Sequence, residues 1–494
     1  MNCKLTEVKD MESVSVSLKE CAACVGAETW EDRKKKQTPS CKFGEEGVCC
    51  RICSMGPCRI THKASRGICG ADADAIAARN YLRMVAGGTA AHSDHGREIC
   101  HVLHATSVDG HYQVKDREKL LSLAREWGIE VENRDIYEIA HEVALTGLME
   151  YGKPFGTQRF LSRATPERQE LWSRLGIAPR AIDREIATAM HMTHMGNTAD
   201  AEALVMQGLR TGLADGWGGS MMATEMTDIL FGTPAPKDTE ADLGVLDRDM
   251  VNIIVHGHDP AMSEMIVLAS EDKDLLEYAR SKGAKGINIA GLCCTANEVT
   301  VRHGVKIAGN FLQQENALLT GMVEMMAVDV QCIFPALGPL SECFHTKFIT
   351  TSPIARIPKS VYVEFNPETA REKGRELVRM AIDNFENRDP NKVFVIENKQ
   401  PARVGYSCEA IIKELNGVTN SFVDERDTYK PLIDVIKAGV LRGAVAMVGC
   451  NNPKVRPDYS HIEIMKTLLK NDIIIITSAF LQIIDIHCGI SYSY

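Results

Sequence analysis

The N-terminal half of the chain carries apolar residues at helical spacing over several long segments. Such periodicity predicts amphipathic helices. One helix is expected to begin at Asp72, whose side chain can cap it, and to end at Gly87-Gly88. Further helices are expected over segments with the same periodicity: Arg117 to Trp127, Ile136 to Met149, Ile182 to Met195 and Ala199 to Leu213. This half is therefore predicted to be all-α.

The pattern changes after the loop-like segment Pro234-Ala235-Pro236. Short, uniformly apolar runs then alternate with helical stretches: Val251 to Val255, Gly286 to Ala290, Val328 to Phe334, Ala444 to Val448 and Asp472 to Thr477. Apolar strands separated by helices are typical of a parallel sheet covered on both faces. The predicted fold class is α/β with an all-α N-terminal domain.

We expect three domains, because 494 residues are enough for each to bury a core of its own. Residues 1–236 would form the helical domain. Residues 237–388 would form a first Rossmann-like domain with a doubly wound parallel sheet. Residues 389–494 would form a second Rossmann-like domain, left incomplete, with the border in the polar stretch from Asn387 to Asn391.

Composition narrows the possible partners and the compartment. The chain has 56 Lys and Arg against 66 Asp and Glu, a net charge of −10, so its surface should repel nucleic acid and anionic membranes. Residues 1–16 do not resemble a signal peptide, and no segment reaches the roughly 18 apolar residues of a spanning helix. A cytoplasmic protein is expected. The 17 cysteines are then metal ligands or buried thiols rather than disulfides.

Six cysteines lie close together in a segment rich in Gly and Pro. Four thiolates on short, curved loops can hold a cubic iron–sulfur cluster, and the four that fit are Cys50, Cys53, Cys58 and Cys69. A zinc knuckle is the alternative, but zinc sites favour paired C-x-x-C arms. Cys41 and Cys49 remain. Two thiolates cannot enclose a cubane, but a twofold axis between identical subunits would supply a second pair.

Soft or imidazole ligands also recur at the ends of the predicted strands. In open parallel sheets, cofactors collect beyond the carboxyl ends of strands. One such residue alone would more often be a core thiol or a structural histidine, but the recurrence predicts a metal cluster. The ligands are found in His256-Gly-His258, Cys293-Cys294, Cys332 and Cys450. No role is assigned to Cys21, Cys24, Cys100, Cys343, Cys408 and Cys488.

A helical stretch places titratable side chains at steps of three: His92, His95, Glu98 and His101. Each step of three turns by about −60° around a helix, so these groups follow a slow spiral with neighbours one turn apart. Such a line can pass protons, because the pKa of histidine lies near neutrality. The alternative is a polar helix face without a role in proton transfer.

These motifs, in this order, closely resemble those of anaerobic nickel-containing carbon monoxide dehydrogenases. The resemblance extends from about Cys41 to Thr477 and includes the Ala-His92-Ser-Asp-His95-Gly-Arg run, Gly-Leu-Cys-Cys-Thr and Val-Gly-Cys450-Asn-Asn-Pro. It implies a homodimer that oxidises CO with water to CO2, two protons and two electrons. Electrons would pass to a ferredoxin-type acceptor, and acetyl-CoA synthase or a nickel-insertion factor is a further implied partner.

The same resemblance implies the cofactors and their ligands. Cys41 and Cys49 would hold a [4Fe-4S] cluster shared across the dimer, and the other four N-terminal cysteines a second [4Fe-4S] cluster in each subunit. The iron atoms of a nickel–iron–sulfur active-site cluster would be held by His258, Cys294, Cys332 and Cys450. His92 would be the acid/base, and His95 and His101 would carry protons outward. Glu98 stands where the family can have another histidine.

The sequence departs from the family after Thr477. The family continues with a Gly-Cys step that supplies another cluster ligand, whereas this chain reads Ser478-Ala-Phe-Leu-Gln and ends at Tyr494. His487 and Cys488 match no motif of the family. We therefore expect a C-terminally truncated subunit with an incomplete active-site cluster, and little or no CO-dependent reduction of viologen by these 494 residues alone.

Two other functions are compatible with part of the pattern. A hybrid-cluster-type hydroxylamine reductase shares the architecture, but the Cys49-Cys50 pair after Cys41 and the His-Gly-His step argue against it. A non-catalytic iron–sulfur protein for electron transfer would keep only the N-terminal clusters. Stoichiometric nickel would favour the dehydrogenase, and iron without nickel would favour either alternative.

Overall fold

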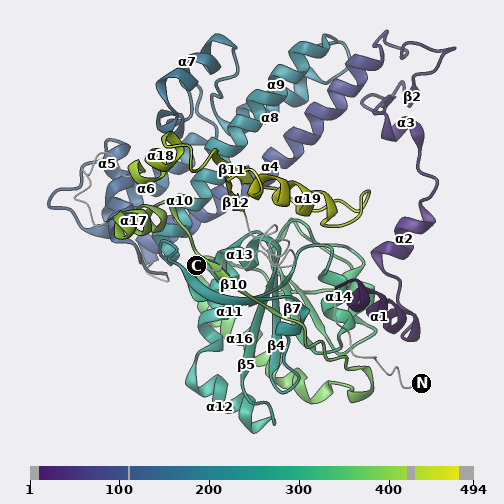
Figure 1. Ribbon diagram of the computed structural model, residues 1–494, viewed down its shortest axis with the longest axis vertical. Coiled ribbons are helices and arrows are strands. Elements are labelled where there is room, and N and C mark those ends of the chain that lie inside the picture. The colour runs from purple at the N-terminus through teal and green to yellow at the C-terminus, as the bar shows by residue number, and fades with distance from the viewer. Residues whose placement is uncertain (1–10, 110–111, 420–428, 478–494) are drawn as a thin grey trace. The chain divides into compact units, whose positions relative to one another are not determined.

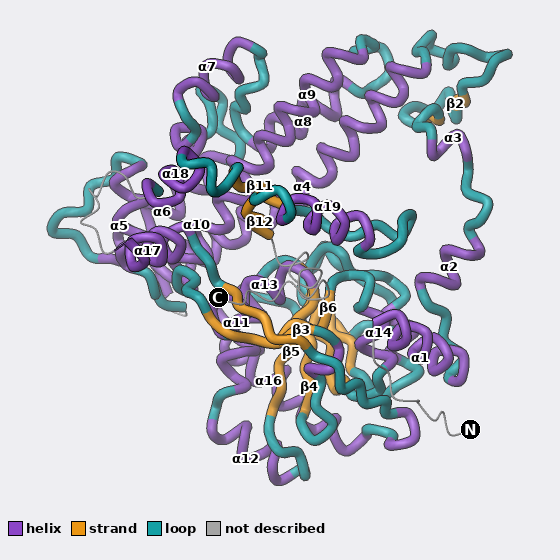
Figure 2. Tube along the Cα trace, viewed as in Figure 1, coloured by secondary structure: helices purple, strands orange, loops and turns teal. Residues whose placement is uncertain are grey.

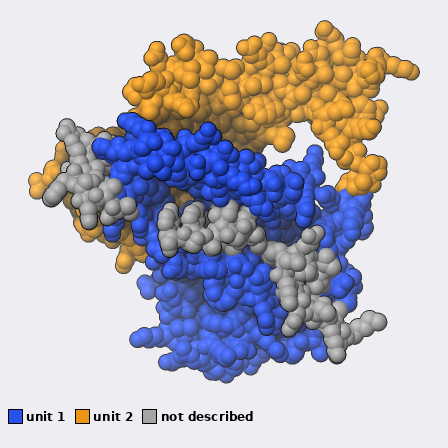
Figure 3. All heavy atoms as spheres, in the orientation of Figure 1, with its two compact units in different colours: residues 1–36, 233–494 blue, residues 37–232 orange. Residues whose placement is uncertain are grey.

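The computed structural model describes residues 11–109, 112–419 and 429–477, and the chain divides into two compact units (Figure 3). The helical unit comprises residues 37–232. The sheet unit comprises residues 1–36 together with residues 233–494. The expected division into one helical and two Rossmann-like domains remains a prediction. No helix among the described residues is both long and apolar enough to cross a membrane.

The helical unit is organised around one long helix, α4 (Ala73–Asp109). The Asp72 carboxylate accepts a hydrogen bond from the Ala75 amide at 3.0 Å, as expected for a cap. The predicted end at Gly87-Gly88 is wrong, because α4 continues through both glycines. Glycine weakens a helix by only about 1 kcal/mol, and packing against neighbouring helices compensates for this loss. The histidine-rich segment therefore belongs to the same helix.

The remaining elements of the helical unit are short segments around the N-terminal cysteines and helices that follow α4. They are α3 (Lys42–Glu45), β1 (Cys49–Cys50), β2 (Cys58–Arg59), α5 (Arg117–Glu126), α6 (Ile136–Glu150), a 3-10 helix (Arg159–Arg163), α7 (Pro166–Arg174), α8 (Ile182–Met192), α9 (Ala201–Ala214), a π-helical turn (Asp215–Ser220) and α10 (Met221–Phe231). The four other predicted helices correspond to α5, α6, α8 and α9. Carboxylate caps at Asp116, Asp135 and Asp200 fix the starts of three of them.

The sheet unit is built on an eight-stranded sheet (Figures 1 and 2). Its strands are β3 (Lys237–Ala241), β4 (Val251–Gly257), β5 (Ile287–Leu292), β6 (Lys306–Gly309), β7 (Val323–Val328), β8 (Lys347–Thr350), β9 (Val361–Tyr362) and β10 (Gln400–Val404). Their spatial order is β10-β3-β6-β5-β4-β7-β8-β9, parallel except for β10. The winding direction reverses between β4 and β7, so the ligand-binding crevice of a doubly wound sheet is expected there.

The helices that lie between strands of this sheet along the chain are α11 (Pro260–Ser270), α12 (Lys273–Ser281), α13 (Cys293–His303), α14 (Gln314–Leu319), α15 (Leu337–Ser341) and α16 (Ala370–Asn384). The other α-helices of this unit are α1 (Met11–Cys24), α2 (Trp30–Lys36), α17 (Cys408–Thr419), α18 (Lys430–Lys437) and α19 (Tyr459–Leu469). A second sheet pairs β11 (Gly443–Met447) and β12 (Ile473–Thr477) in parallel, close to the strands expected there.

Side chains of the central strands alternate between two apolar layers. On β4, Ile254 packs in one layer, whereas Ile253 and Val255 pack in the other. On β7, Met326 and Met325 are divided in the same way. Every residue of both strands is buried. This burial on both faces is what the uniformly apolar sequence of the strands predicted.

One predicted strand was misplaced. The sequence favoured Val328 to Phe334, but the strand is β7, Val323–Val328. Glu324 interrupts the apolar pattern of β7, yet its side chain is fully buried because His345 and Arg388 both bond its carboxylate. Cys332 therefore lies in the loop after the strand rather than within it.

Helices α11 and α16 approach closely at Gly374. A Cβ atom placed there would lie 2.8 Å from the Met265 carbonyl oxygen, a backbone atom that cannot turn aside. We therefore expect Gly374→Ala to lower the free energy of unfolding by about 1–3 kcal/mol through overpacking. Urea unfolding measures this. Arg371→Ala, an exposed change on the same helix, is the control, and equal midpoints for the two variants would contradict the prediction.

Candidate functional site

The N-terminal cysteines are positioned by a short antiparallel pair of strands. Cys50 on β1 lies directly opposite Cys58 on β2, and Cys49 lies opposite Arg59. Successive residues of a strand point to opposite faces, so Cys49 and Cys50 point away from each other. Cys50 is buried on the face that packs against Ala75 and Ile76 of α4.

Four cysteines line one cavity. It has about 290 Å³ of space free of atoms, including the part open to solvent. Its lining comprises Cys50, Cys53, Met55, Gly56, Cys58, Gly67, Ile68, Cys69, Ala71 and Ile76. A Cβ atom at Gly56 would lie 3.0 Å from the Cys50 carbonyl oxygen, so this tight turn favours glycine. The cavity collects the four thiols expected to bind one cubane, and it does not include Cys41 or Cys49.

The Cys69 thiol is already biased toward the thiolate. A hydrogen bond from the Ala71 backbone lowers the pKa of Cys69, and the Arg79 guanidinium acts in the same direction. Metal ligation requires thiolates. The donor set and its electrostatic environment therefore fit an iron–sulfur cluster.

In the sheet unit, the buried Asp329 carboxylate joins the segments at the point where the winding direction reverses, between β4 and β7. It follows β7 and accepts hydrogen bonds from the backbone amides of His258, Asp259 and Val330. The Thr295 hydroxyl on α13 donates to the same carboxylate at 2.6 Å. Burial raises the pKa of Asp329, whereas these donors oppose the shift. The segments that follow β4, β5 and β7 are thereby joined by one side chain.

The backbone around this carboxylate is strained. A Cβ atom at Gly257, whose φ is +132°, would lie only 2.0 Å from the Asp329 carboxylate. Cys293, Gln331 and Cys332 have φ values of 64°, 65° and 58°, in the left-handed region that non-glycine residues rarely adopt. Strained backbone of this kind persists where surrounding structure holds it, and it is common at functional sites.

Cys332 and His258 lie side by side at this edge of the sheet. The Cys332 sulfur is 3.9 Å from His258 Nε2, and the fully buried Gln314 side chain donates to the Cys332 carbonyl at 3.0 Å. A hydrogen bond from the Cys293 thiol, together with the nearby histidine rings, lowers the pKa of Cys332 to about 4. The buried His258 Nδ1 has no hydrogen-bond partner among the described residues. The Cys293 thiol and the histidine rings thus favour the thiolate form of Cys332.

Cys294 and Cys450 belong to the same electrostatic neighbourhood. Burial raises the pKa of Cys294, with further contributions from Cys450 and Cys332. Burial and Cys332 raise the pKa of Cys450 to about 11. Within the described ranges, no three His, Cys, Asp or Glu side chains are positioned to hold a single metal ion.

The expected histidine relay lies on α4 in the helical unit. His92 Nδ1 is 2.7 Å from the carboxylate of Asp215, the first residue of the π-helical turn. Such turns are frequent at functional sites. Sequence reasoning missed Asp215, although the run Asp215-Gly-Trp-Gly-Gly in a helical context was a usable signal. It also missed Asp329, a carboxylate directly after a buried strand.

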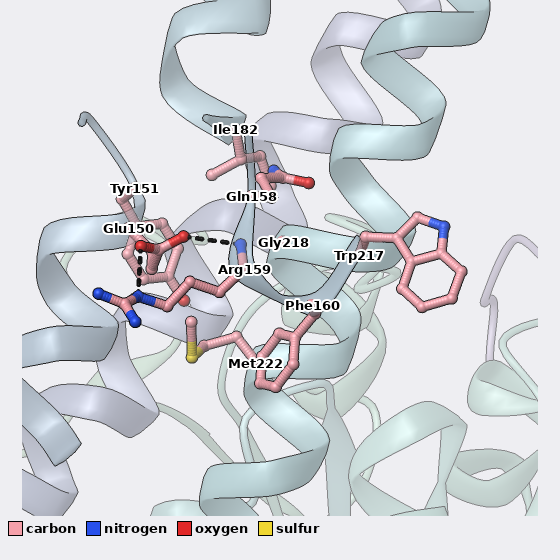
Figure 4. A pocket seen from close by; sticks show the side chains of 9 residues that line it. All are labelled: Glu150, Tyr151, Gln158, Arg159, Phe160, Ile182, Trp217, Gly218 and Met222. Atoms are coloured by element: carbon pink, nitrogen blue, oxygen red, sulfur yellow. Dashed lines mark hydrogen bonds and ion pairs between the residues drawn. The ribbon is translucent and has the colours of Figure 1, made fainter. Parts of the chain in front are cut away.

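Glycines allow α4 and the π-helical turn to approach. A Cβ atom at Gly96 would lie 2.4 Å from the Tyr151 hydroxyl, and one at Gly219 would lie 3.1 Å from His92 Cβ. Tyr151 and Gln158 line a small pocket that also contains Gly218, with Glu150 bonded to Arg159 at its edge (Figure 4). A Cβ atom at Gly218 would collide with Gln158. The pocket residues therefore support the turn that carries Asp215.

The outer part of the relay meets a second helix. Burial, with contributions from His104 and Arg97, lowers the pKa of His101. The His104 ring contacts the His141 ring of α6, with centroids 4.9 Å apart. Burial and the Asp94 charge raise the pKa of Glu98. The titratable groups on α4 therefore continue past His101 to a neighbouring helix.

Comparison with known proteins gives consistent results. The Prismane/CO dehydrogenase family matches residues 48–481. Carbon monoxide dehydrogenase 1 of Methanosarcina mazei is 51% identical over 486 residues, which cover 97% of this chain and 76% of that protein. A Ni-free crystal structure of carbon monoxide dehydrogenase from Thermococcus sp. AM4, produced without CooC maturase, has a TM-score of 0.92 at 45% identity, covering 99% of this chain and 76% of that one.

A second similar structure is that of an acetyl-CoA synthase/carbon monoxide dehydrogenase with NiZn[Fe4S4] and NiNi[Fe4S4] clusters in its alpha subunits. The matched chain is 37% identical with a TM-score of 0.90, and the match covers 97% of this chain and 73% of that chain. The mixed architecture, with a helical N-terminal region and a largely parallel sheet, is therefore the architecture of these structures.

The role of Asp329 can be tested in the metal-free chain. Asp329→Asn removes the charge and puts an NH2 donor among backbone donors. This change should lower the free energy of unfolding by about 1–3 kcal/mol. We expect faster hydrogen exchange at the amides of His258, Asp259 and Val330, measured by mass spectrometry. The exposed change Asp238→Asn is the control. Unchanged exchange at the three amides would contradict the prediction.

Proposed function

Because the chain belongs to the Prismane/CO dehydrogenase family, we propose that it is a catalytic subunit that oxidises CO with water to CO2, two protons and two electrons. The observation that carries the proposal is the set of residues that follow β4, β5, β7 and β11: His258, Cys294, Cys332 and Cys450. They share one electrostatic neighbourhood in the sheet unit. The names of the relatives favour neither hydroxylamine reduction nor a purely electron-carrying role.

These four residues are proposed to hold the iron atoms of a nickel–iron–sulfur cluster. When bound, such a cluster supplies the centre at which CO and water are activated. The chain contributes a thiolate at Cys332, an imidazole at His258 whose Nδ1 has no other described partner, and a backbone held by Asp329. This rigid edge would keep the ligands in place before the metal arrives.

His92 is proposed as the acid/base. A carboxylate only accepts hydrogen bonds, so the Asp215 carboxylate favours the tautomer of His92 that carries its proton on Nδ1. The lone pair on Nε2 of His92 can then accept a proton. His95, Glu98 and His101 are proposed to pass that proton along α4. The raised pKa of Glu98 suits this task, since a carrier works best when its pKa is near the working pH.

Electrons are proposed to leave through two cubane clusters. Cys50, Cys53, Cys58 and Cys69 would hold one cluster in each subunit, and the Cys41 and Cys49 pairs of a homodimer would share the other. A ferredoxin-type protein is the proposed acceptor. Acetyl-CoA synthase and a nickel-insertion factor are proposed as further partners, because similar proteins are named together with acetyl-CoA synthase and with the CooC maturase.

The activity can be tested with anaerobically purified protein loaded with nickel and iron. A carbon monoxide dehydrogenase should contain stoichiometric nickel and reduce viologen in the presence of CO, even if only slowly. His92→Gln should lower that rate by about 10²–10⁴-fold without changing the metal content, since it removes general acid–base catalysis. His191→Gln, an exposed histidine on α8, is the control.

Iron without nickel, together with no CO-dependent reduction, would contradict the proposed function. Stoichiometric nickel with even a slow CO-dependent rate would support it.

The N-terminal cubane can be tested independently of catalysis. Cys53→Ser removes one of the four thiols that line the cavity, so we expect the loss of roughly four iron atoms per chain and of one [4Fe-4S] EPR signal. Iron analysis and EPR of the dithionite-reduced protein measure both. Cys343→Ser changes a cysteine outside the cavity and should keep the iron. Full iron content in Cys53→Ser would exclude Cys53 as a ligand.

A further inference from the structure

The line of titratable side chains on α4 does not end at His101. Three residues farther along lies His104, and each step of three turns by about −60° around the helix. The four steps from His92 to His104 therefore turn by about −240°. The line begins beside the π-helical turn, where His92 meets Asp215, and ends where His104 contacts His141 of α6.

A serine fixes the tautomer of His141. The Ser107 hydroxyl donates its single proton to the His104 carbonyl oxygen at 2.6 Å. The same hydroxyl oxygen lies 3.2 Å from His141 Nδ1, and it can only accept there. His141 therefore carries a hydrogen on Nδ1 when neutral, and the lone pair of Nε2 is available for a proton.

His104 and His141 differ from the histidines that stabilise the fold. His303 and His345 are each held by a buried carboxylate, Glu264 and Glu324, at 2.7 and 2.9 Å. Among the described residues, no carboxylate pairs with the ring of His104 or of His141, and the adjacent Glu142 is paired with Arg134. Neither ring is therefore held by a carboxylate in the way that His303 and His345 are.

His104, the member of this histidine pair that lies on α4, also interacts with His101 of the relay. His104 is one of the groups that lower the pKa of His101, so the two rings interact electrostatically. Arg97, which also lowers the pKa of His101, is bonded to Asp183 and lies over the Tyr151 ring. His141 is half-buried and thus reaches solvent.

We propose that His141 is the exit of the proton path. A proton passes from His101 to His104, then to Nε2 of His141, and from there to a base in solution. Ser107 is a positioning residue that keeps Nε2 of His141 ready to accept. The inference rests on the proposed function, because CO oxidation by water releases two protons for each CO.

Two alternative roles for the contact between the rings lead to different outcomes. His101 is itself accessible to solvent, so protons could leave the relay there. The His104 and His141 rings could also serve only to pack α4 against α6. In the first case, replacing His141 leaves the rate unchanged. In the second, any loss of rate follows a loss of folding and does not depend on buffer.

The test uses the metal-loaded holoenzyme and His141→Gln, measured at low and at high concentrations of imidazole buffer. Glutamine is polar but cannot carry a proton at neutral pH. At low buffer we expect kcat for CO oxidation to fall roughly tenfold, with KM for CO unchanged. High imidazole should restore kcat, because a diffusing base replaces the missing exit. His191→Gln should match the wild type at both concentrations.

The positioning role of Ser107 has a spectroscopic test on the chain without its clusters. In ¹⁵N NMR, the wild type should show His141 protonated on Nδ1, and Ser107→Ala should shift its tautomer equilibrium toward the Nε2-protonated form. An unchanged tautomer in Ser107→Ala would overturn that role.

Several outcomes separate the exit from the proposed function. If the wild type oxidises CO and His141→Gln retains its full kcat at low buffer concentration, His141 is not the exit of the proton path and the proposed function stands. A loss of kcat that imidazole does not restore would also overturn the proposal that His141 is the exit. A wild-type enzyme with nickel but without CO-dependent reduction would contradict the proposed function.

Discussion

The hydrogen bonding of one buried carboxylate is the constraint on which the edge of the sheet depends. Asp329 follows β7 and accepts from the backbone after β4, from its own loop and from Thr295 on α13, the helix after β5. A buried charge is tolerated only when it is paired or fully hydrogen-bonded. The cost of burying Asp329 is therefore offset only while these segments stay together. Gly257 leaves the room that the carboxylate needs.

Buried carboxylates play a similar part elsewhere in the two units. Glu185 in the helical unit accepts from Arg180 and Gln207, and Glu324 in the sheet unit binds His345 and Arg388. Both side chains are fully buried. Removing one partner from such a group would leave an uncompensated charge. These groups make the scaffold rigid, and His104 and His141 differ because no carboxylate among the described residues pairs with either ring.

Local rules predicted much of this fold. A carboxylate cap at Asp72, periodic apolar positions and uniformly apolar strands identified most elements, and the expected position of the candidate ligands after strands followed from the topology of parallel sheets. The predictions for two elements were wrong for physical reasons. Helix α4 continues through Gly87-Gly88 because it packs against neighbouring helices. Strand β7 was not recognised because Glu324 interrupts its apolar pattern, and the partners that allow Glu324 to be buried, His345 and Arg388, lie far along the chain. Asp215 and Asp329 were missed for the same reason, since their importance depends on long-range contacts.

The strand β1 has only two residues, both cysteines, and this sets a limit on changes in its length. Their side chains alternate across the strand, so one inserted or deleted residue would exchange the directions of the two thiols. Cys50 would then turn away from the cavity it shares with Cys53, Cys58 and Cys69. A substitution of a neighbouring residue would leave the directions intact. This segment should therefore accept changes of residue type far more readily than insertions or deletions.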